Sequence, residues 1–180
     1  MAKKVIFLDR DGTLNIDHGY VNEAKQWQWI DGAIDACKRL QDAGYALAIV
    51  TNQSGIAQGM YTVEQMHKLH QYMNAEFEAR GVHIAMIAYC PHARNQTDCD
   101  CRKPKIGMAN QIEAKIGDID YANSWIVGDK EADLLFGKTA GTHAALIRSK
   151  YWEEGKLSAQ PDLIVDSLKQ ATDSILSSRA

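Results

Sequence analysis

The sequence lacks any apolar run long enough to cross a membrane. Runs such as YALAIV at 45–50 are far shorter than the roughly 20 residues that a transmembrane helix needs. The first residues, MAKKVIFLDRDG, place two lysines before an apolar run, but Asp9 ends that run too early for a secretory signal. We therefore predict a cytoplasmic protein that does not bind a membrane.

An excess of positive charge is also missing. The net charge is −3, so the composition gives no reason to expect a nucleic-acid partner or an anionic surface. Repeats, low-complexity segments and linkers are absent as well. With 46% hydrophobic residues in 180, we predict one domain, 1–180, with a substantial core. A monomer is the default expectation.

Cysteine is scarce and unevenly placed. Three of the four cysteines lie in the stretch YCPHARNQTDCDCRKPK, where Cys90 and His92 form one close pair and Cys99 and Cys101 form another. In a reducing compartment such a cluster favours a metal over a disulfide. Four soft or borderline ligands suit a closed, structural zinc site, although the spacing differs from the common C-x₂-C pattern. The remote Cys37 is interpreted as a small buried hydrophobe.

Short apolar runs alternate with longer amphipathic stretches along the chain. Near-continuous hydrophobicity in the runs is typical of strands that are buried on both faces of a parallel sheet. We predict a doubly wound, mainly parallel, Rossmann-like α/β fold, in which ligands bind beyond the carboxyl ends of the strands. The expected strands are 5–9, 45–51, 84–89, 125–129, 143–147 and 162–166, and the expected helices are 31–43, 62–80, 107–116 and 130–139, with caps at Asp31, Thr62 and Asp129.

Polar residues end three of these strands. In DRDGT (9–13), Asp9 and Asp11 form either a turn or a pair of carboxylates that a bound Mg²⁺ would neutralise. In TNQSG (51–55), a hydroxyl, amides and main-chain N–H groups form either a phosphate cradle or an ordinary polar loop. In GDKEAD (128–133), two carboxylates open a helix and serve either as a cap or as ligands.

The order of these motifs is specific as a set. DRDGT and TNQSG are followed by a Lys103–Pro104 pair and then by GDKEAD. From Val5 to Asp133 this order resembles the haloacid dehalogenase (HAD)-type phosphatase superfamily. Together with CPH and CDCRKPK, it is similar to a narrower group that contains the heptose 1,7-bisphosphate phosphatases and the histidinol-phosphate phosphatases. The resemblance also strengthens the expectation of zinc on the four Cys and His ligands.

The resemblance implies phosphate-ester hydrolysis through an aspartyl-phosphate. Asp9 would be the nucleophile, and Asp11 would protonate the leaving oxygen and later activate water. A catalytic Mg²⁺ would be held by Asp9, the main-chain carbonyl of Asp11 and Asp129, with Asp133 in a supporting place. Thr51 and Lys103 would bind the oxygens of the transferring phosphoryl group. Arg102, counted with the catalytic residues, would recognise a distal phosphate or sugar hydroxyls.

The resemblance also implies a small phosphorylated sugar as substrate. The chain has little room for a separate cap domain, so the flap LNIDHGYV (14–21) and the cysteine loop would wall the pocket. The Gly-Tyr pair in the flap favours the heptose group, in which the 7-phosphate is removed on the route to lipopolysaccharide-core precursors. Substrate contacts are expected from Asp17, Gly19, Tyr20, Thr51, Asn52, Gln53, Ser54, Arg102 and Lys103. Lys130 is either a further substrate contact or a solvated lysine at the start of a helix.

Three other functions stay open at this point. Histidinol-phosphate phosphatase activity would use the same catalytic residues. A phosphatase of nucleic-acid ends is disfavoured because no basic and aromatic surface stretch is visible. A non-catalytic zinc-loop binding module is disfavoured by the complete set of Asp9, Asp11, Lys103 and Asp129.

Overall fold

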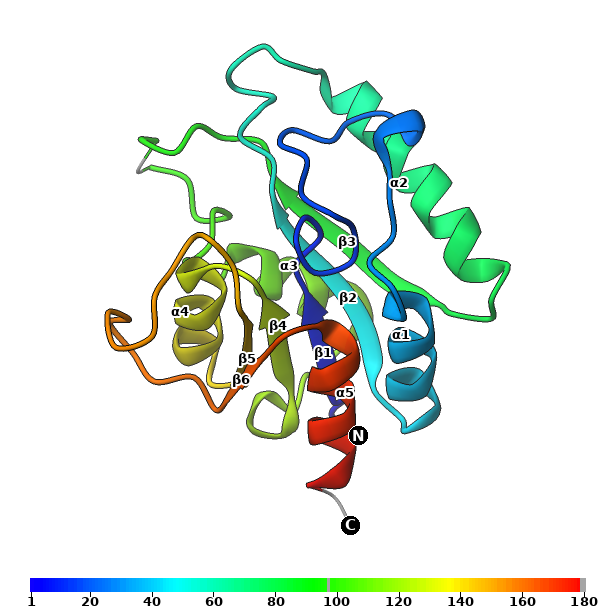
Figure 1. The fold of residues 1–180 in the computed structure, drawn as a ribbon, viewed down its shortest axis with the longest axis vertical. Helices are drawn as coiled ribbons and strands as arrows, with labels where there is room; N and C mark the ends of the chain where they lie inside the picture. Colours follow the sequence, from blue (N-terminus) through cyan, green and yellow to red (C-terminus); the bar gives the residue numbers. More distant parts are fainter. Residues whose placement is uncertain (97, 179–180) are drawn as a thin grey trace.

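The protein is built on one parallel sheet with helices on both faces. The computed structural model describes residues 1–96 and 98–178, and within these residues six strands are arranged in the order β3-β2-β1-β4-β5-β6 (Figure 1). All neighbouring pairs are parallel. The strands are β1 (Val5–Leu8), β2 (Ala46–Asn52), β3 (Ile84–Cys90), β4 (Trp125–Gly128), β5 (His143–Ile147) and β6 (Leu163–Val165). The predicted α/β fold class is confirmed.

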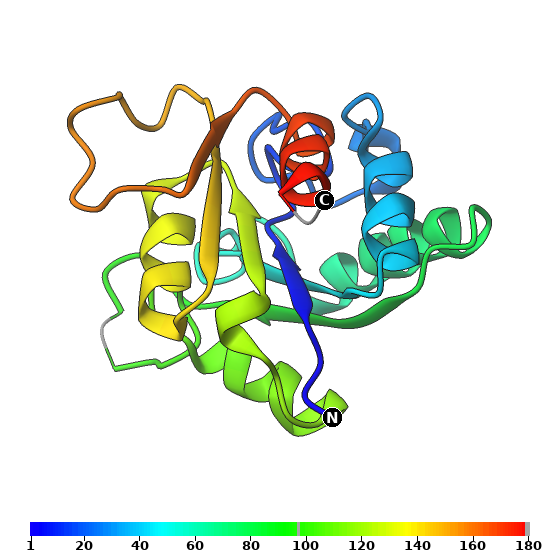
Figure 2. The same cartoon turned by 90° about the horizontal axis from the view of Figure 1, so that it is seen from below.

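Two hydrophobic clusters hold helices on opposite faces of the sheet. Ile6 and Leu8 of β1 face one cluster, and Val5 and Phe7 face the other, as the alternation of side chains along a strand requires. Seen from below, the two helical layers lie on either side of the central strands (Figure 2). One layer contains α1 (Ala33–Asp42), α2 (Val63–Glu78) and α5 (Leu168–Ser177), and the other contains α3 (Gly107–Ile116) and α4 (Glu131–Ala140).

The sequence predicted the N-cap of one helix correctly and the N-caps of two others wrongly. Thr62 caps α2 through the main-chain N–H of Gln65, as predicted. The predicted caps Asp31 and Asp129 are wrong. The left-handed backbone of Gly32, at φ 73°, turns the chain into α1, so Asp31 stays exposed outside the helix.

The start of α4 is set from inside the helix. Its first turn is closed by the carboxylate of Asp133, which accepts the main-chain N–H of Lys130. Helix α5 is an element that the sequence analysis did not predict. It is capped by Ser167 and buries Leu168, Ala171 and Ile175 against the sheet.

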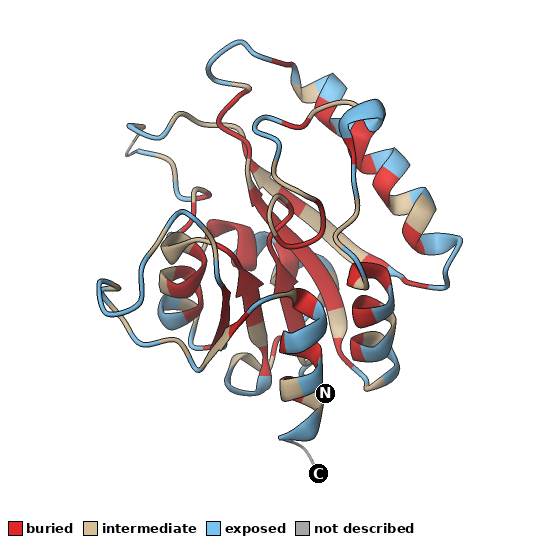
Figure 3. Ribbon diagram, viewed as in Figure 1, coloured by how far each residue is buried: buried red, intermediate tan, exposed pale blue. Residues whose placement is uncertain are grey.

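The active end of the sheet is covered by loops rather than by a cap domain. Segments 12–30, 53–62 and 91–106 all leave the carboxyl ends of strands and gather at the same end of the molecule. Of regular structure, the described parts of these segments hold only the short 3₁₀ helix η1 (Ala24–Gln26). The strands beneath are largely buried (Figure 3). Among the described residues, no helix is long and apolar enough to cross a membrane.

Candidate active site

The predicted strand-end residues meet at one edge of the sheet. Asp9 follows β1, Thr51 and Asn52 end β2, and Asp129 follows β4. Because β1 pairs with both β2 and β4, the three strand ends lie next to one another. This is the place where the strand order reverses and where open α/β sheets bind their ligands.

Three buried carboxylates form a compact cluster there. One oxygen each from Asp9, Asp129 and Asp133 lies within 4.8 Å of the others. Burial, and then the charge of Asp9, raise the pKa of Asp129 to about 8. A further cation beside Asp129 would keep its carboxylate ionised at neutral pH, and hard oxygen ligands of this kind fit Mg²⁺. The residues present therefore fit a magnesium site.

Gly12 allows the main chain to pass close to this cluster. A Cβ at this position would lie 2.2 Å from Asp129 Oδ2, far inside contact distance. Its φ of 83° is also a conformation that favours glycine. The glycine of the DRDGT motif is therefore required by the approach of its own backbone to Asp129.

Lys103 supplies the positive charge inside the cluster. Its ammonium donates to Asp9 Oδ1 at 2.9 Å, to Asp133 Oδ1 at 2.6 Å and to the carbonyl oxygen of Val50 at 2.7 Å. These contacts use all three of its protons. Burial alone would lower the pKa of Lys103, but the charges of Asp133 and Asp9 outweigh it and raise this pKa above the ordinary value. The ammonium is thus charged throughout the physiological range.

Asn52 fixes the backbone of this lysine. Its Oδ1 accepts the main-chain N–H of Lys103 at 3.0 Å, and its Nδ2 donates to the Lys103 carbonyl at 3.3 Å. The side chain that was expected to bind substrate therefore also clamps the end of the cysteine loop onto β2.

Asp11 is oriented by three donors. Its Oδ1 accepts from Arg10 Nη2 and from Asn15 Nδ2, each at 3.0 Å, and its Oδ2 accepts from Gln53 Nε2 at 3.2 Å. Gln53 also donates to the hydroxyl of Thr51 at 2.8 Å and accepts from that of Tyr61. The carboxyl group expected to act as acid and base is therefore held in one direction.

Arg10 and His70 form a buried pair behind Asp11 that the sequence analysis missed. Arg10 is completely buried, contacts His70 Nε2 through Nη1 at 3.2 Å and donates to the carbonyl of Val21 at 2.6 Å. Burial, followed by the charge of Arg10, lowers the pKa of His70 to about 3, so the ring is a neutral acceptor. The sequence offered one signal for this pair: Arg10 is a basic residue between two carboxylates at the end of a buried strand.

Two connected cavities open at the site. A small one of about 50 Å³ is lined by Asp9, Asp11, Asn52, Lys103, Lys130, Ala132 and Asp133. A larger one of about 150 Å³ shares Asp11, Asn52 and Lys130 with it and extends under the flap. The further residues around this larger cavity are Asp17, Gly19, Tyr20, Gln53, Ser54, Tyr61, Arg94 and Tyr151.

This lining agrees only in part with the expected substrate contacts. Arg94, Tyr61 and Tyr151 were not expected there, because nothing in the local sequence marks them. Arg102 lines neither cavity, and its Nη1 instead donates to the carbonyl of His92 at 3.4 Å. The cysteine loop thus presents Arg94 to the larger cavity.

The four predicted zinc ligands come together. Donor atoms of Cys90, His92, Cys99 and Cys101 all lie within 4.8 Å of one another, and all three cysteines are free thiols. His92 Nδ1 lies 3.5 Å from Cys90 Sγ and 3.2 Å from Cys101 Sγ, separations close to those between ligands of one tetrahedral zinc. Burial and the neighbouring thiols raise the pKa of Cys101 to about 12, so deprotonation of this thiol requires a bound cation. The residues fit a zinc ion.

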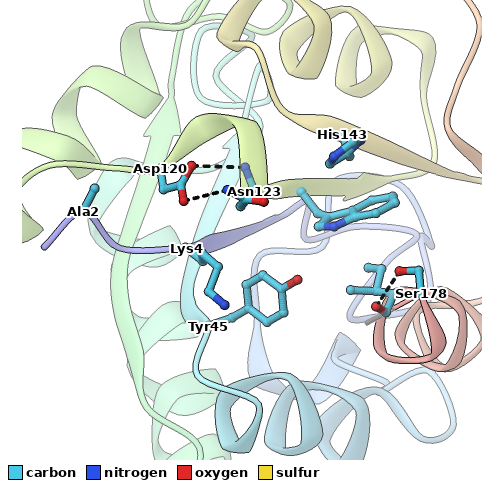
Figure 4. Close-up of a pocket in the computed structure, with 9 residues that line it drawn as sticks. Ala2, Lys4, Tyr45, Asp120, Asn123, His143 and Ser178 are labelled. Atoms are coloured by element: carbon cyan, nitrogen blue, oxygen red, sulfur yellow. Dashed lines mark hydrogen bonds between the residues drawn. The ribbon is translucent and has the colours of Figure 1, made fainter. Parts of the chain in front are cut away.

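Another cavity, of about 500 Å³, lies at the opposite end of the sheet (Figure 4). Lys4, Tyr45, Trp125 and His143 line it, and each precedes or begins a strand. Lys4 lies over the ring of Tyr45, and Trp125 is stacked on His143. The side chains that line this cavity thus contact one another. The carboxylates of the active site lie at the opposite edge of the sheet.

The catalytic domain agrees with a known family model. Residues 4–146 match the model described as polynucleotide kinase 3 phosphatase. A D-glycero-beta-D-manno-heptose-1,7-bisphosphate 7-phosphatase of Haemophilus ducreyi is 46% identical over 175 residues, which cover 93% of this chain and 96% of that protein. The protein of the same name from Vibrio cholerae is 40% identical, with 98% of each chain covered. The chain belongs to the heptose-1,7-bisphosphate 7-phosphatase family.

A solved structure of a heptose bisphosphate phosphatase has the same fold as this chain. The D,D-heptose 1,7-bisphosphate phosphatase of B. bronchiseptica, crystallised with magnesium and phosphate, is 30% identical and superposes with a TM-score of 0.87. The alignment covers 97% of this chain and 99% of that one. The chain is therefore an HAD-type phosphatase, as its resemblance implied, and the interpretation as a non-catalytic module is wrong.

Burial of a neutral His70 makes the stability of the fold depend on pH. Below its ordinary pKa of 6.5 the unfolded chain takes up a proton that the folded chain accepts only near pH 3. The free energy of unfolding should therefore fall by about 1.4 kcal/mol for each pH unit below 6.5, or about 2 kcal/mol by pH 5.

His70→Gln keeps an acceptor for Arg10 and should flatten this slope in urea unfolding. The exposed His83→Gln is the control and should keep the wild-type slope; equal slopes in both variants would contradict the assignment.

Proposed function

We propose that this chain removes the 7-phosphate of D-glycero-β-D-manno-heptose 1,7-bisphosphate in a Mg²⁺-dependent reaction and leaves the 1-phosphate in place. The observation that carries the proposal is the pair of connected cavities. The small one contains the reacting carboxylates, and the larger one carries Arg94 and Lys130 for a second anionic group. The names of the relatives at 40–51% identity support the same substrate, and the reaction belongs to lipopolysaccharide heptose synthesis.

The first half-reaction transfers the phosphoryl group to Asp9. An oxygen of Asp9 attacks phosphorus, the bond from phosphorus to the C7 oxygen breaks, and Asp11 donates its proton to that leaving oxygen. In the second half-reaction Asp11, now ionised, takes a proton from water, whose oxygen attacks the aspartyl-phosphate. Inorganic phosphate leaves, and both carboxyl groups return to their starting states. The three donors around Asp11 fix the direction of its carboxyl group for both steps.

The surrounding residues neutralise charge as phosphorus is attacked. When bound by Asp9, Asp129 and the main-chain carbonyl of Asp11, magnesium would offset the repulsion between carboxylate and phosphate. Lys103 and the hydroxyl of Thr51 are fixed before substrate arrives, so little reorganisation is needed when charge spreads over the phosphoryl oxygens. Asp133 positions Lys103 and the first turn of α4.

The charge of the larger cavity also separates the two candidate substrates. The distal phosphate of heptose bisphosphate is an anion that guanidinium and ammonium groups bind well. Histidinol phosphate instead carries an amine at its distal end, which Arg94 and Lys130 would repel. The one carboxylate of the flap that faces this cavity, Asp17, is already engaged by protein donors.

We also propose that the Cys and His cluster holds a structural zinc. With three thiols and one imidazole every position of a tetrahedral ion is filled by protein, which leaves no site for substrate. The loop between the ligands carries Arg94, and the residue two after Cys101 is Lys103. A zinc ion there would keep both cations ordered before substrate binds, which reduces the entropy cost of binding.

The nucleophile is tested by Asp9→Asn. The amide cannot attack phosphorus, so release of inorganic phosphate from heptose bisphosphate in the presence of Mg²⁺ should be lost. Lys103 keeps its contacts with Val50 and Asp133, so the melting temperature should stay near that of the wild type. The exposed Asp118→Asn serves as control and should retain full turnover. Turnover of Asp9→Asn at the wild-type rate would exclude this mechanism.

The substrate is tested by comparing kcat/KM for heptose 1,7-bisphosphate and histidinol phosphate. We expect a preference for the bisphosphate of at least about 100-fold, because one extra charge-assisted contact contributes about 1.5–3 kcal/mol and a repelled amine adds to the difference. Arg94→Ala should reduce this preference mainly through the KM of the bisphosphate. A preference for histidinol phosphate would overturn the substrate while leaving the chemistry of Asp9 and Asp11 intact.

The zinc site is tested by metal analysis of protein purified without chelator, which should find about one zinc per chain. Cys101→Ser should lose the metal, lower the melting temperature and raise the KM, because Lys103 and Arg94 lose their support. Cys37→Ala, in the opposite core cluster, should keep the zinc. A zinc-free protein with four reactive thiols and full activity would refute the site.

A further inference from the structure

Tyr151 joins three segments around the substrate cleft. It lies in the loop that follows β5, and its hydroxyl donates to Asp17 Oδ2 of the flap at 2.7 Å. The ammonium of Lys130, at the start of α4, lies 4.4 Å from the centre of its ring. The hydrogen bond spans 134 positions of the chain. A segment that lies outside the sequence motifs of the active site therefore contributes to the lining of the cleft.

The contact fixes the flap because Asp17 organises its turn. Asp17 Oδ1 accepts the main-chain N–H of Gly19 at 2.9 Å, and the next residue, Tyr20, has a left-handed φ of 52°. Burial would raise the pKa of Asp17, but the hydrogen bond from Tyr151 and that from Gly19 outweigh it and hold the pKa below its ordinary value. Asp17 is thus an ionised anchor with a protein donor on each oxygen.

The loop that carries Tyr151 is itself tied to the catalytic end of β4. Ser149 Oγ donates to the carbonyl of Asp129 at 2.6 Å and accepts the main-chain N–H of Tyr151 at 3.2 Å. Lys130 completes the connection, since its ammonium lies 2.9 Å from Asp129 Oδ1 and 3.8 Å from Asp17 Oδ2. The ring and the hydroxyl of Tyr151 therefore contact one cation and one anion that are themselves neighbours, Lys130 and Asp17.

We propose that Tyr151 is a positioning residue that determines specificity by holding Asp17 of the flap and the ammonium of Lys130 over the larger cavity. The inference rests on the proposed function, because that cavity is the one assigned to the distal part of the bisphosphate. Tyr151 lines the larger cavity and is absent from the lining of the small one, where phosphoryl transfer occurs. Its loss should therefore affect recognition of a long substrate more than the chemical step.

The first test is Tyr151→Phe, which keeps the ring beside Lys130 and removes only the donor to Asp17. We expect the KM for heptose 1,7-bisphosphate to rise about tenfold, the usual size for a hydrogen bond to a charged group, with a much smaller change in kcat. The ratio of kcat/KM for the bisphosphate to that for p-nitrophenyl phosphate should fall by a similar factor. Tyr72→Phe, a half-exposed tyrosine on α2, is the matched control and should keep the ratio.

A double-mutant cycle separates the contact from a general structural effect. In an Asp17→Ala background, Tyr151→Phe should produce no further rise in KM, because the partner of the hydroxyl is already missing. A full additional effect in that background would show that the hydroxyl acts elsewhere and would overturn the proposal.

Hydrogen exchange of the flap gives a readout that needs no substrate. Amides of residues 16–21 should exchange faster in Tyr151→Phe than in the wild type or in Tyr72→Phe. If the wild type shows no preference for the bisphosphate but the flap exchanges faster in the variant, the proposed function fails while the positioning role stands. If the exchange and the selectivity ratio both match the wild type, the positioning role is wrong whatever the substrate.

Discussion

A single buried ammonium connects the folding of this protein to its chemistry. The three protons of Lys103 join Val50 of β2, Asp9 after β1 and Asp133 in α4, so one charge ties two strands and a helix together. Removal of this ammonium would leave two buried carboxylates without their cationic partner, at a cost of about 3–5 kcal/mol to stability. The same group faces the phosphoryl site, so loss of activity in such a variant would combine unfolding with loss of catalysis.

The position of the Lys103 ammonium depends on the cysteine loop that precedes it. A lysine side chain is flexible, and its backbone here belongs to a long loop rather than to a helix or strand. The side chain of Asn52 hydrogen-bonds to the lysine backbone from β2, and the proposed zinc on the four clustered ligands would hold the loop two residues earlier. Both interactions act on the main chain, and the cluster of carboxylates then fixes the side chain.

The sequence predicted those features that depend on local pattern. Apolar strands ending in acids placed Asp9 and Asp129 at one edge, and the spacing of the cysteines placed the four clustered ligands. It did not predict contacts that depend on tertiary structure alone. The Arg10–His70 pair joins residues 60 positions apart; the two carboxylates beside Arg10 hint at its role, but nothing in the sequence around His70 pairs it with Arg10. Helix α5 was missed because its short amphipathic pattern follows a loop without readable chemistry, and the cap at Asp31 was wrong because Gly32 turns the backbone.

The close approach of Gly12 to Asp129 restricts how such an enzyme can evolve. Since any side chain at position 12 would collide with a carboxylate of the reacting cluster, the catalytic end of β1 is closed to variation. The walls of the larger cavity are different, because most of them come from loops outside the sheet: the flap, the segment after β2, the cysteine loop and the loop after β5. Changes there alter the shape and charge that a substrate meets without moving a carboxylate. New substrates can therefore be acquired by exchange of loops, while the reaction itself is inherited unchanged.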